Sequence, residues 1–145
     1  MTDEFSMRGF NKSDIDSLAE FKRKSVKINL PDASENSVKN YKKNLLKWNK
    51  KEPEGIKIAE KNGEIAGYIW LNTKKRYGLI RHLFVKEKFR REGLAKKLFF
   101  LAENYFKKKK KEKIRLTATL KREWLVEFYE RMGYEKKRVI MEKDI

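Results

Sequence analysis

The chain has 145 residues, a length that suits a single domain spanning residues 1–145 and leaves little room for a second core. It carries 38 Lys and Arg against 21 Asp and Glu, a formal net charge of +17, with no Cys and one His. This composition excludes disulfides, a thiol nucleophile, zinc-thiolate sites and mechanisms that need two histidines. With 39% hydrophobic and 12% aromatic residues, a packed core is expected rather than a disordered chain.

No stretch of the sequence approaches the ~20 consecutive apolar residues of a membrane span. The N-terminus, Met1-Thr-Asp-Glu, is acidic and lacks the basic and then apolar order of an export signal, so we expect a cytoplasmic protein. The net positive charge favours a polyanionic partner. Nucleic acid and phosphorylated small molecules are the partners we retain, and a membrane partner is not expected.

The first third of the chain predicts a strand and two helices. An aromatic-containing stretch at residues 5–10 predicts the strand, and apolar residues at helical spacing after Ser13 predict the first helix. Pro31 interrupts the chain, and a second helix is expected from Ser34. Its apolar side chains share one face because they follow a 3-4-3 spacing: Val38, Tyr41, Leu45 and Trp48.

Three strands are expected next. Asn62 and Gly63 supply the positive φ of a tight turn, which predicts a hairpin of antiparallel strands at residues 56–60 and 64–73. The apolar segment at residues 78–86, GLIRHLFVK, predicts the third strand.

The last part of the chain predicts two helices and two strands. A wide apolar stripe over residues 94–105 predicts a long helix, which the lysines at residues 107–111 close. Residues 114–120 have the β-branched and apolar composition of a strand. A short helix is expected over residues 124–132, ended by Gly133, and a final strand over residues 134–142.

This order of elements indicates an α/β (α+β) fold with a mixed sheet of about six strands and four helices on its two faces. Strands 78–86 and 114–120 are joined through a helix, so they should be parallel neighbours.

A turn with anion-binding character links strand 78–86 to the long helix. Gly93 opens the helix, whose first amides lack partners inside it, and no side chain at that position blocks a ligand. The surrounding cations favour a pyrophosphate: Arg90, Arg91, Lys96 and Lys97. Read alone, residues 90–95 also fit an ordinary connection between a strand and a helix.

Two motifs in the correct order resemble the GNAT N-acetyltransferase superfamily. The turn reads Arg90-x-x-Gly93-x-Ala95, which is similar to that family's acetyl-coenzyme A motif, and FYERMGY at residues 128–134 resembles its second signature. The resemblance is good over residues 56–145, whereas residues 1–55 match in element order only.

The resemblance implies acetyl-coenzyme A as the acyl donor. Its pyrophosphate would lie on the backbone amides of the turn, and its pantetheine arm would pair as an extra strand with the main chain of strand 78–86. The thioester would then lie where two parallel central strands splay apart. The implied binding residues are Arg90, Arg91, Glu92, Gly93, Leu94, Ala95 and Lys96 in the turn, and Leu83, Phe84 and Val85 in the strand.

Direct transfer to a primary amine needs an acid for the leaving thiolate, and Tyr129 resembles the family's acid. A phenol of pKa ~10 keeps its proton at neutral pH and can pass it to a thiolate whose conjugate acid has a pKa near ~8.5. Without the family context, Tyr129 would be read as one aromatic of the apolar stripe along helix 124–132.

Two positions depart from the family pattern. Arg81 stands where many members have Glu, so the general base is open and water is one candidate; an arginine there could also bind an acidic acceptor or lie exposed. Alternation places His82 on the face opposite Arg81, so His82 is expected to be structural unless a bulge resets the register. Arg122 stands where members often have Asn.

Acceptor specificity is expected from the first two helices and their connection at residues 25–34, because loops on a rigid scaffold carry variable recognition. Asp32 and Glu35 could attract an ammonium group or merely stabilise a helix start. Tyr68 and Trp70 share a strand face and could wall the acceptor site or pack under a helix. The acceptor is left open between a protein N-terminus, a lysine and a small amine.

Two other functions are retained as alternatives. The net charge and the lysines at residues 107–111, beside Tyr105 and Phe106, would suit a nucleic-acid-binding or ribosome-binding domain. A domain of the same fold that binds acyl-coenzyme A without catalysis is the second alternative. Both a monomer and a homodimer are compatible with the sequence.

Overall fold

A computed structural model of the chain describes residues 4–29, 35–118 and 122–145. The strands are β1 (Ser6–Gly9), β2 (Ile56–Lys61), β3 (Glu64–Thr73), β4 (Gly78–Val85) and β5 (Ile114–Arg115). The helices are α1 (Ile15–Asn29), α2 (Glu35–Lys51), α3 (Leu94–Lys108) and α4 (Glu123–Arg131). Among the helices so described, none has the length and apolar character to cross a membrane.

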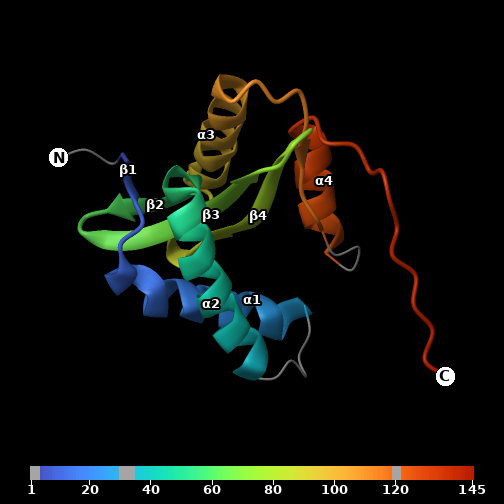
Figure 1. The fold of residues 1–145 in the computed structure, drawn as a ribbon, viewed down its shortest axis with the longest axis horizontal. Coiled ribbons are helices and arrows are strands. Elements are labelled where there is room, and N and C mark those ends of the chain that lie inside the picture. The colour runs from blue at the N-terminus through green and yellow to red at the C-terminus, as the bar shows by residue number, and fades with distance from the viewer. Residues whose placement is uncertain (1–3, 30–34, 119–121) are drawn as a thin grey trace.

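The sheet is mixed and follows chain order, β1-β2-β3-β4-β5, with helices on both faces (Figure 1). The first three pairings are antiparallel, and β4 and β5 are parallel. The predicted α/β fold class is therefore confirmed, and so is the parallel pair joined through a helix. Asn62 and Gly63 have φ of 55° and 77° and form the predicted tight turn between β2 and β3.

The core is divided by the sheet, because neighbouring side chains of a strand point to opposite faces. On one face, α1 and α2 pack on Ile58, Tyr68 and Trp70 of the strands. On the other face, α3 packs on Ile69 and Leu71. The buried residues of α2 include Tyr41 and Leu45, as its 3-4-3 spacing predicts.

The strand expected over residues 134–142 is not present, so the sheet has five strands instead of about six. Residues 134–145 contain neither helix nor strand, and the chain leaves the sheet beyond α4 (Figure 1). Val139, Ile140 and Met141 are 63%, 80% and 87% exposed. The apolar residues favour a strand locally, but β5 offers an edge of only two residues, and a strand needs a partner along its length.

The strand expected over residues 114–120 is also shorter than predicted. It pairs with β4 only through Gly78 with Ile114 and Leu79 with Arg115, and residues 116–118 are not in a strand. Residues 119 and 120 lie outside the described part of the chain. Beyond Leu79, therefore, the edge of β4 that faces β5 is no longer paired with it, which is the predicted splay.

A substitution at Gly78, which pairs with Ile114 at the start of β4, tests the packing between β4 and α3. A Cβ added to Gly78 would lie 2.3 Å from the ring of Phe106, which is 1% exposed, so this buried ring would have to shift. We expect Gly78→Ala to lower the free energy of unfolding by about 1–3 kcal/mol in urea denaturation. Gly9→Ala is the control, because a Cβ there meets nothing within 4 Å. Equal effects of the two substitutions would contradict this packing.

Candidate functional site

The turn between β4 and α3 has the backbone of an anion-binding loop. Arg91 and Gly93 have φ of 68° and 82°, and Gly93 is the N-cap of α3. The first helical hydrogen bond of α3 is donated by the Lys97 amide to the Gly93 carbonyl, at 3.1 Å. Consecutive amides in such a left-handed turn form a concave donor surface for anions.

Most amides of this turn have no acceptor within the described residues. The amide of Arg90 is the exception, because it donates to the Glu87 carbonyl at 3.1 Å. The amides that remain are those of the predicted binding residues Arg91, Glu92, Gly93, Leu94, Ala95 and Lys96. The space beside Gly93 is open, since a Cβ built there meets nothing within 4 Å.

Charged side chains around the turn add to its positive potential. Arg91 and Lys96 are exposed, and the one acidic side chain of the predicted set, Glu92, is bound by Lys61 at 2.6 Å. Arg90 is turned toward the strand, where its Nε donates to the Val85 carbonyl at 3.0 Å. The turn thus combines donor amides with excess positive charge, which suits a phosphate or diphosphate group.

A cavity of about 120 Å³, here called the gap pocket, opens where β4 and β5 diverge. Its walls come from residues 80–83 of β4, Phe99 of α3, residues 116–118, and Arg122, Leu125 and Tyr129 at and within α4. Of the three predicted strand residues, Leu83 lines this pocket. The side chains of Phe84 and Val85 are buried, so these two residues offer only their main chain.

Tyr129 lies in the wall of the gap pocket and is held by other aromatic rings. Its ring centroid is 5.6 Å from that of Phe99 and 6.2 Å from that of Tyr134. Burial raises the pKa of Tyr129 above its usual value of 10.0, and the nearby charge of Arg122 partly opposes this effect. The phenol is therefore protonated at neutral pH and can donate a proton into the pocket.

A bulge in β4 brings two successive side chains to a second cavity. Trp70 pairs with His82 and Leu71 pairs with Ile80, so Arg81 has no opposite residue in β3. A bulge of this kind redirects a side chain that strict alternation would place on the other face. Arg81 and His82 consequently line the same cavity, which reopens a role for His82 beyond the structural one.

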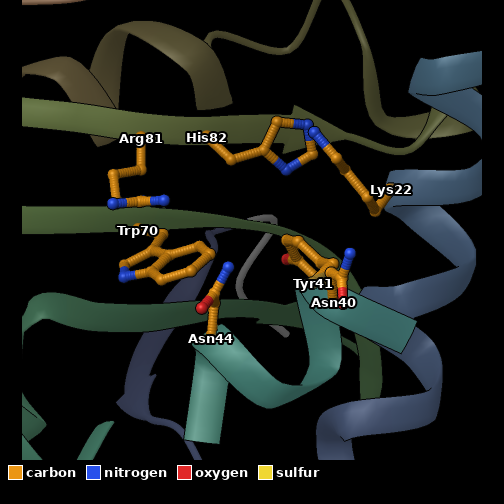
Figure 2. Close-up of a pocket in the computed structure, with 7 residues that line it drawn as sticks. All are labelled: Lys22, Asn40, Tyr41, Asn44, Trp70, Arg81 and His82. Carbon is orange, nitrogen blue, oxygen red and sulfur yellow. The ribbon is translucent and has the colours of Figure 1, made fainter. Parts of the chain in front are cut away.

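This second cavity, here called the bulge pocket, has a volume of about 190 Å³ and lies on the α1 and α2 side of the sheet (Figure 2). Its other walls are Lys22 of α1, Asn40, Tyr41 and Asn44 of α2, and Trp70 of β3. Arg81 and His82 line the gap pocket as well. The two pockets therefore meet at the bulge of β4, one on each side of the strand.

The sequence pointed only partly to the bulge pocket. Trp70 was expected as an acceptor-site wall or a core residue, and it is 3% exposed and lines the pocket. Asn40 and Asn44 were missed, although two uncharged amides four residues apart in a lysine-rich helix are a detectable signal. The side chains of residues 25–37, with Asp32 and Glu35 among them, lie outside the described part.

His82 is bound to the core by a chain of hydrogen bonds. The Tyr68 hydroxyl is hydrogen-bonded both to Nδ1 of His82 and to the Tyr41 hydroxyl. Burial, aided by the charge of Lys22, lowers the pKa of His82 from 6.5 to about 3. The imidazole is therefore neutral at physiological pH.

This low pKa predicts a pH dependence of stability. Between pH 3 and 6.5 the unfolded chain binds a proton that the folded chain does not, so the contribution of neutral His82 is complete above pH 6.5 and falls with the pH. From pH 7 to pH 4.5 we expect the wild type to lose about 2–3 kcal/mol more unfolding free energy than His82→Gln. Urea denaturation at both pH values measures this, and parallel losses would refute it.

Comparison with known proteins places this geometry in a family. The model of the acetyltransferase (GNAT) domain matches residues 29–144. The chain belongs to the GNAT acetyltransferase family. The family accounts for the glycine turn at the start of α3 and for the parallel strands that splay, and the resemblance noted from the two motifs is confirmed.

Relatives and solved GNAT structures agree with this assignment. The chain is 26% identical over 144 residues to an uncharacterized N-acetyltransferase of Methanocaldococcus jannaschii, covering 94% of this chain and 63% of that protein. It is 39% identical over 75 residues to one of Archaeoglobus fulgidus, covering 47% of this chain and 49% of that protein. It therefore spans less than two thirds of either relative.

The fold is also similar to that of solved GNAT proteins. The structure of the PaiA N-acetyltransferase of Thermoplasma acidophilum, solved with coenzyme A, superposes with a TM-score of 0.77 at 21% identity. The match covers 94% of this chain and 93% of that one. At this identity the likeness shows the shared fold, a five-stranded mixed sheet with four helices.

Proposed function

We propose that residues 1–145 form one acetyltransferase domain that passes an acetyl group from acetyl-coenzyme A directly to a primary amine. The observation that carries the proposal is the meeting of the two pockets at Arg81 and His82. A donor in the gap pocket and an acceptor in the bulge pocket would approach each other at this bulge without a covalent enzyme intermediate, which fits a chain that has no cysteine.

The turn and the strand edge fit acetyl-coenzyme A, which supplies an activated acetyl thioester. The amides of residues 91–96 would bind its pyrophosphate, with Arg91 and Lys96 adding charge. Beyond Leu79 the edge of β4 is not paired with β5, and it would bind the pantetheine arm through the main chain of Leu83 and Val85, whose carbonyl also accepts from Arg90. Open space at Gly93 supports the same assignment.

Tyr129 is assigned the role of the acid that protonates the departing thiolate. Its wall position in the gap pocket and its raised pKa support this role. The amine must lose a proton as well. Neither pocket is lined by a carboxylate of the described residues, and Arg81 occupies the position where many members have Glu, so water is the proposed base.

Two measurements test the proposal together. Acetyl-coenzyme A should raise the melting temperature by mass action, and free thiol should appear when an amine acceptor is added. Thiol reagents give no background from the protein because the chain has no cysteine. Binding of acetyl-coenzyme A without turnover for any amine or protein acceptor would point instead to a non-catalytic acyl-coenzyme A binder.

The same melting experiment tests the nucleic-acid alternative. The lysines at residues 107–110 are exposed at the C-terminal end of α3, and Lys109 lies 5.2 Å from the Tyr105 ring. Stabilisation by RNA that weakens steeply as salt rises would support nucleic-acid binding. The proposed enzyme predicts that acetyl-coenzyme A gives the larger and less salt-dependent shift.

A further inference from the structure

The bulge pocket concentrates positive charge. Arg81 and Lys22 contribute two cationic side chains to its lining, and none of its described residues is acidic. The carboxylates of α1 are occupied elsewhere, since Asp16 is bound by Lys42 at 3.1 Å and Glu20 is paired with Arg23. The lining is therefore suited to an anion and unsuited to a second ammonium group.

Neither cation of the bulge pocket is neutralised by a carboxylate of the described residues. Burial lowers the pKa of Lys22, and the charge of Arg81 lowers it further. Lys22 likewise disfavours the charged form of His82. These like-charge effects show that the pocket has an excess of positive charge, which a bound anion would relieve.

The Arg81 guanidinium lies over two indole rings. It lies 4.7 Å from the Trp70 ring centroid and 5.9 Å from that of Trp48. Figure 2 shows the guanidinium beside the indole of Trp70, with Asn44 of α2 on the other side of that indole from β4. A guanidinium placed over an aromatic ring can still bind a carboxylate through two hydrogen bonds.

The size of the pocket and its neutral polar groups further restrict the class of ligand. At about 190 Å³ the pocket is smaller than the ~300 Å³ typical of sites for drug-sized ligands. Asn40 and Asn44 lie one helical turn apart on α2 and offer amide donors and acceptors at its edge. A small molecule suits a space of this size.

From these observations we infer that the acceptor is a small primary amine carrying a carboxylate, whose carboxylate is bound by Arg81 with the support of Lys22 while its amine faces the gap pocket. This inference rests on the proposed function and specifies the substrate class of the same site. The inferred substrate class differs from that of enzymes that acetylate polycations. A second ammonium group on the acceptor would lie beside the like charges of Arg81 and Lys22, which disfavour it.

The test is a matched series of amines with thiol release as the readout. Amino acids from glycine to 6-aminohexanoate are each compared with the diamine and the alkylamine of equal chain length. We expect the carboxylate-bearing member to have a kcat/KM about 10- to 100-fold above its partners at the optimal length, the size of a charge-assisted interaction. A preference for diamines, or no preference, would overturn the inference.

Variants connect the preference to the named cations. Arg81→Gln and Lys22→Gln should reduce the ratio of kcat/KM for the amino acid to that for the alkylamine, whereas Arg81→Lys should retain part of it. Lys43→Gln is the control, because Lys43 is exposed on α2 and does not line the pocket. An equal drop in the ratio for Lys43→Gln would indicate the general field of the protein and overturn the assignment to the pocket.

Acetyl-coenzyme A binding, measured by thermal shift without acceptor, separates this inference from the proposed function. If acetyl-coenzyme A stabilises the protein and no carboxylate-bearing amine is acetylated, the inference fails and donor binding stands. If acetyl-coenzyme A does not bind, the proposed function fails and the inference fails with it.

Discussion

Replacement of Tyr129 by Phe is expected to lower kcat by about 10²–10³-fold, within the usual contribution of a positioned general acid. The KM for acetyl-coenzyme A should change little, because the amides that are proposed to hold the pyrophosphate lie in the turn before α3 and in its first residues, and not on α4. Steady-state thiol release over a range of acetyl-coenzyme A concentrations, at saturating acceptor, measures both quantities.

The loss should come from the missing proton and not from misfolding. The Tyr129 ring contacts Phe99 and Tyr134, and a phenylalanine keeps these contacts. Tyr134→Phe is the matched control, since the buried Tyr134 hydroxyl has no hydrogen-bond partner in the described part of the chain. Removing that hydroxyl should leave turnover unchanged. If Tyr129→Phe behaves like Tyr134→Phe, Tyr129 is not the acid.

The second large effect is expected at Gly93. Gly93→Val should weaken acetyl-coenzyme A binding at least about tenfold and abolish most of the thermal stabilisation by this ligand. Valine tolerates the φ of 82° poorly, at a cost of about 1–3 kcal/mol, and its side chain would occupy the open space beside the amides. Isothermal calorimetry with acetyl-coenzyme A measures the dissociation constant.

Strain and ligand loss are separated by a substitution at a second glycine. Gly63 has a similar φ of 77° and equally open surroundings, but it lies in the turn between β2 and β3. Gly63→Val should destabilise the protein comparably and bind acetyl-coenzyme A normally. Equal binding by both variants would show that the turn at Gly93 does not hold the donor.

The arrangement at β4 explains how one strand could serve two substrates. Its pairing with β5 ends after two residues, which opens the gap pocket, and its bulge at Arg81 opens the route to the bulge pocket. Both features are local departures from a regular sheet, at the place where the proposed reaction would occur. Departures of this kind are typical of functional sites, because a regular ladder leaves no edge for a ligand.

The sequence alone was sufficient for features that depend on neighbouring residues. The apolar spacing of α2 predicted its buried face, Asn62 and Gly63 predicted the hairpin turn, and Gly93 predicted an unobstructed turn before α3. These features are local because helical periodicity and positive φ values are properties of a few adjacent residues. The two family motifs combined such local features and led to the correct family.

Only the tertiary structure decided the features that depend on strands brought together from distant positions. The apolar residues 139–141 predicted a strand, but the short β5 provides no edge for it. Alternation separated Arg81 from His82, and the bulge, which is a property of the register with β3, brought them to one pocket. The sequence does not distinguish Lys22 from the other lysines. The packing of α1 against the sheet places it in the lining of the same pocket as Arg81. Pairing register and long-range packing are set by the whole molecule, so no short stretch of sequence contains them.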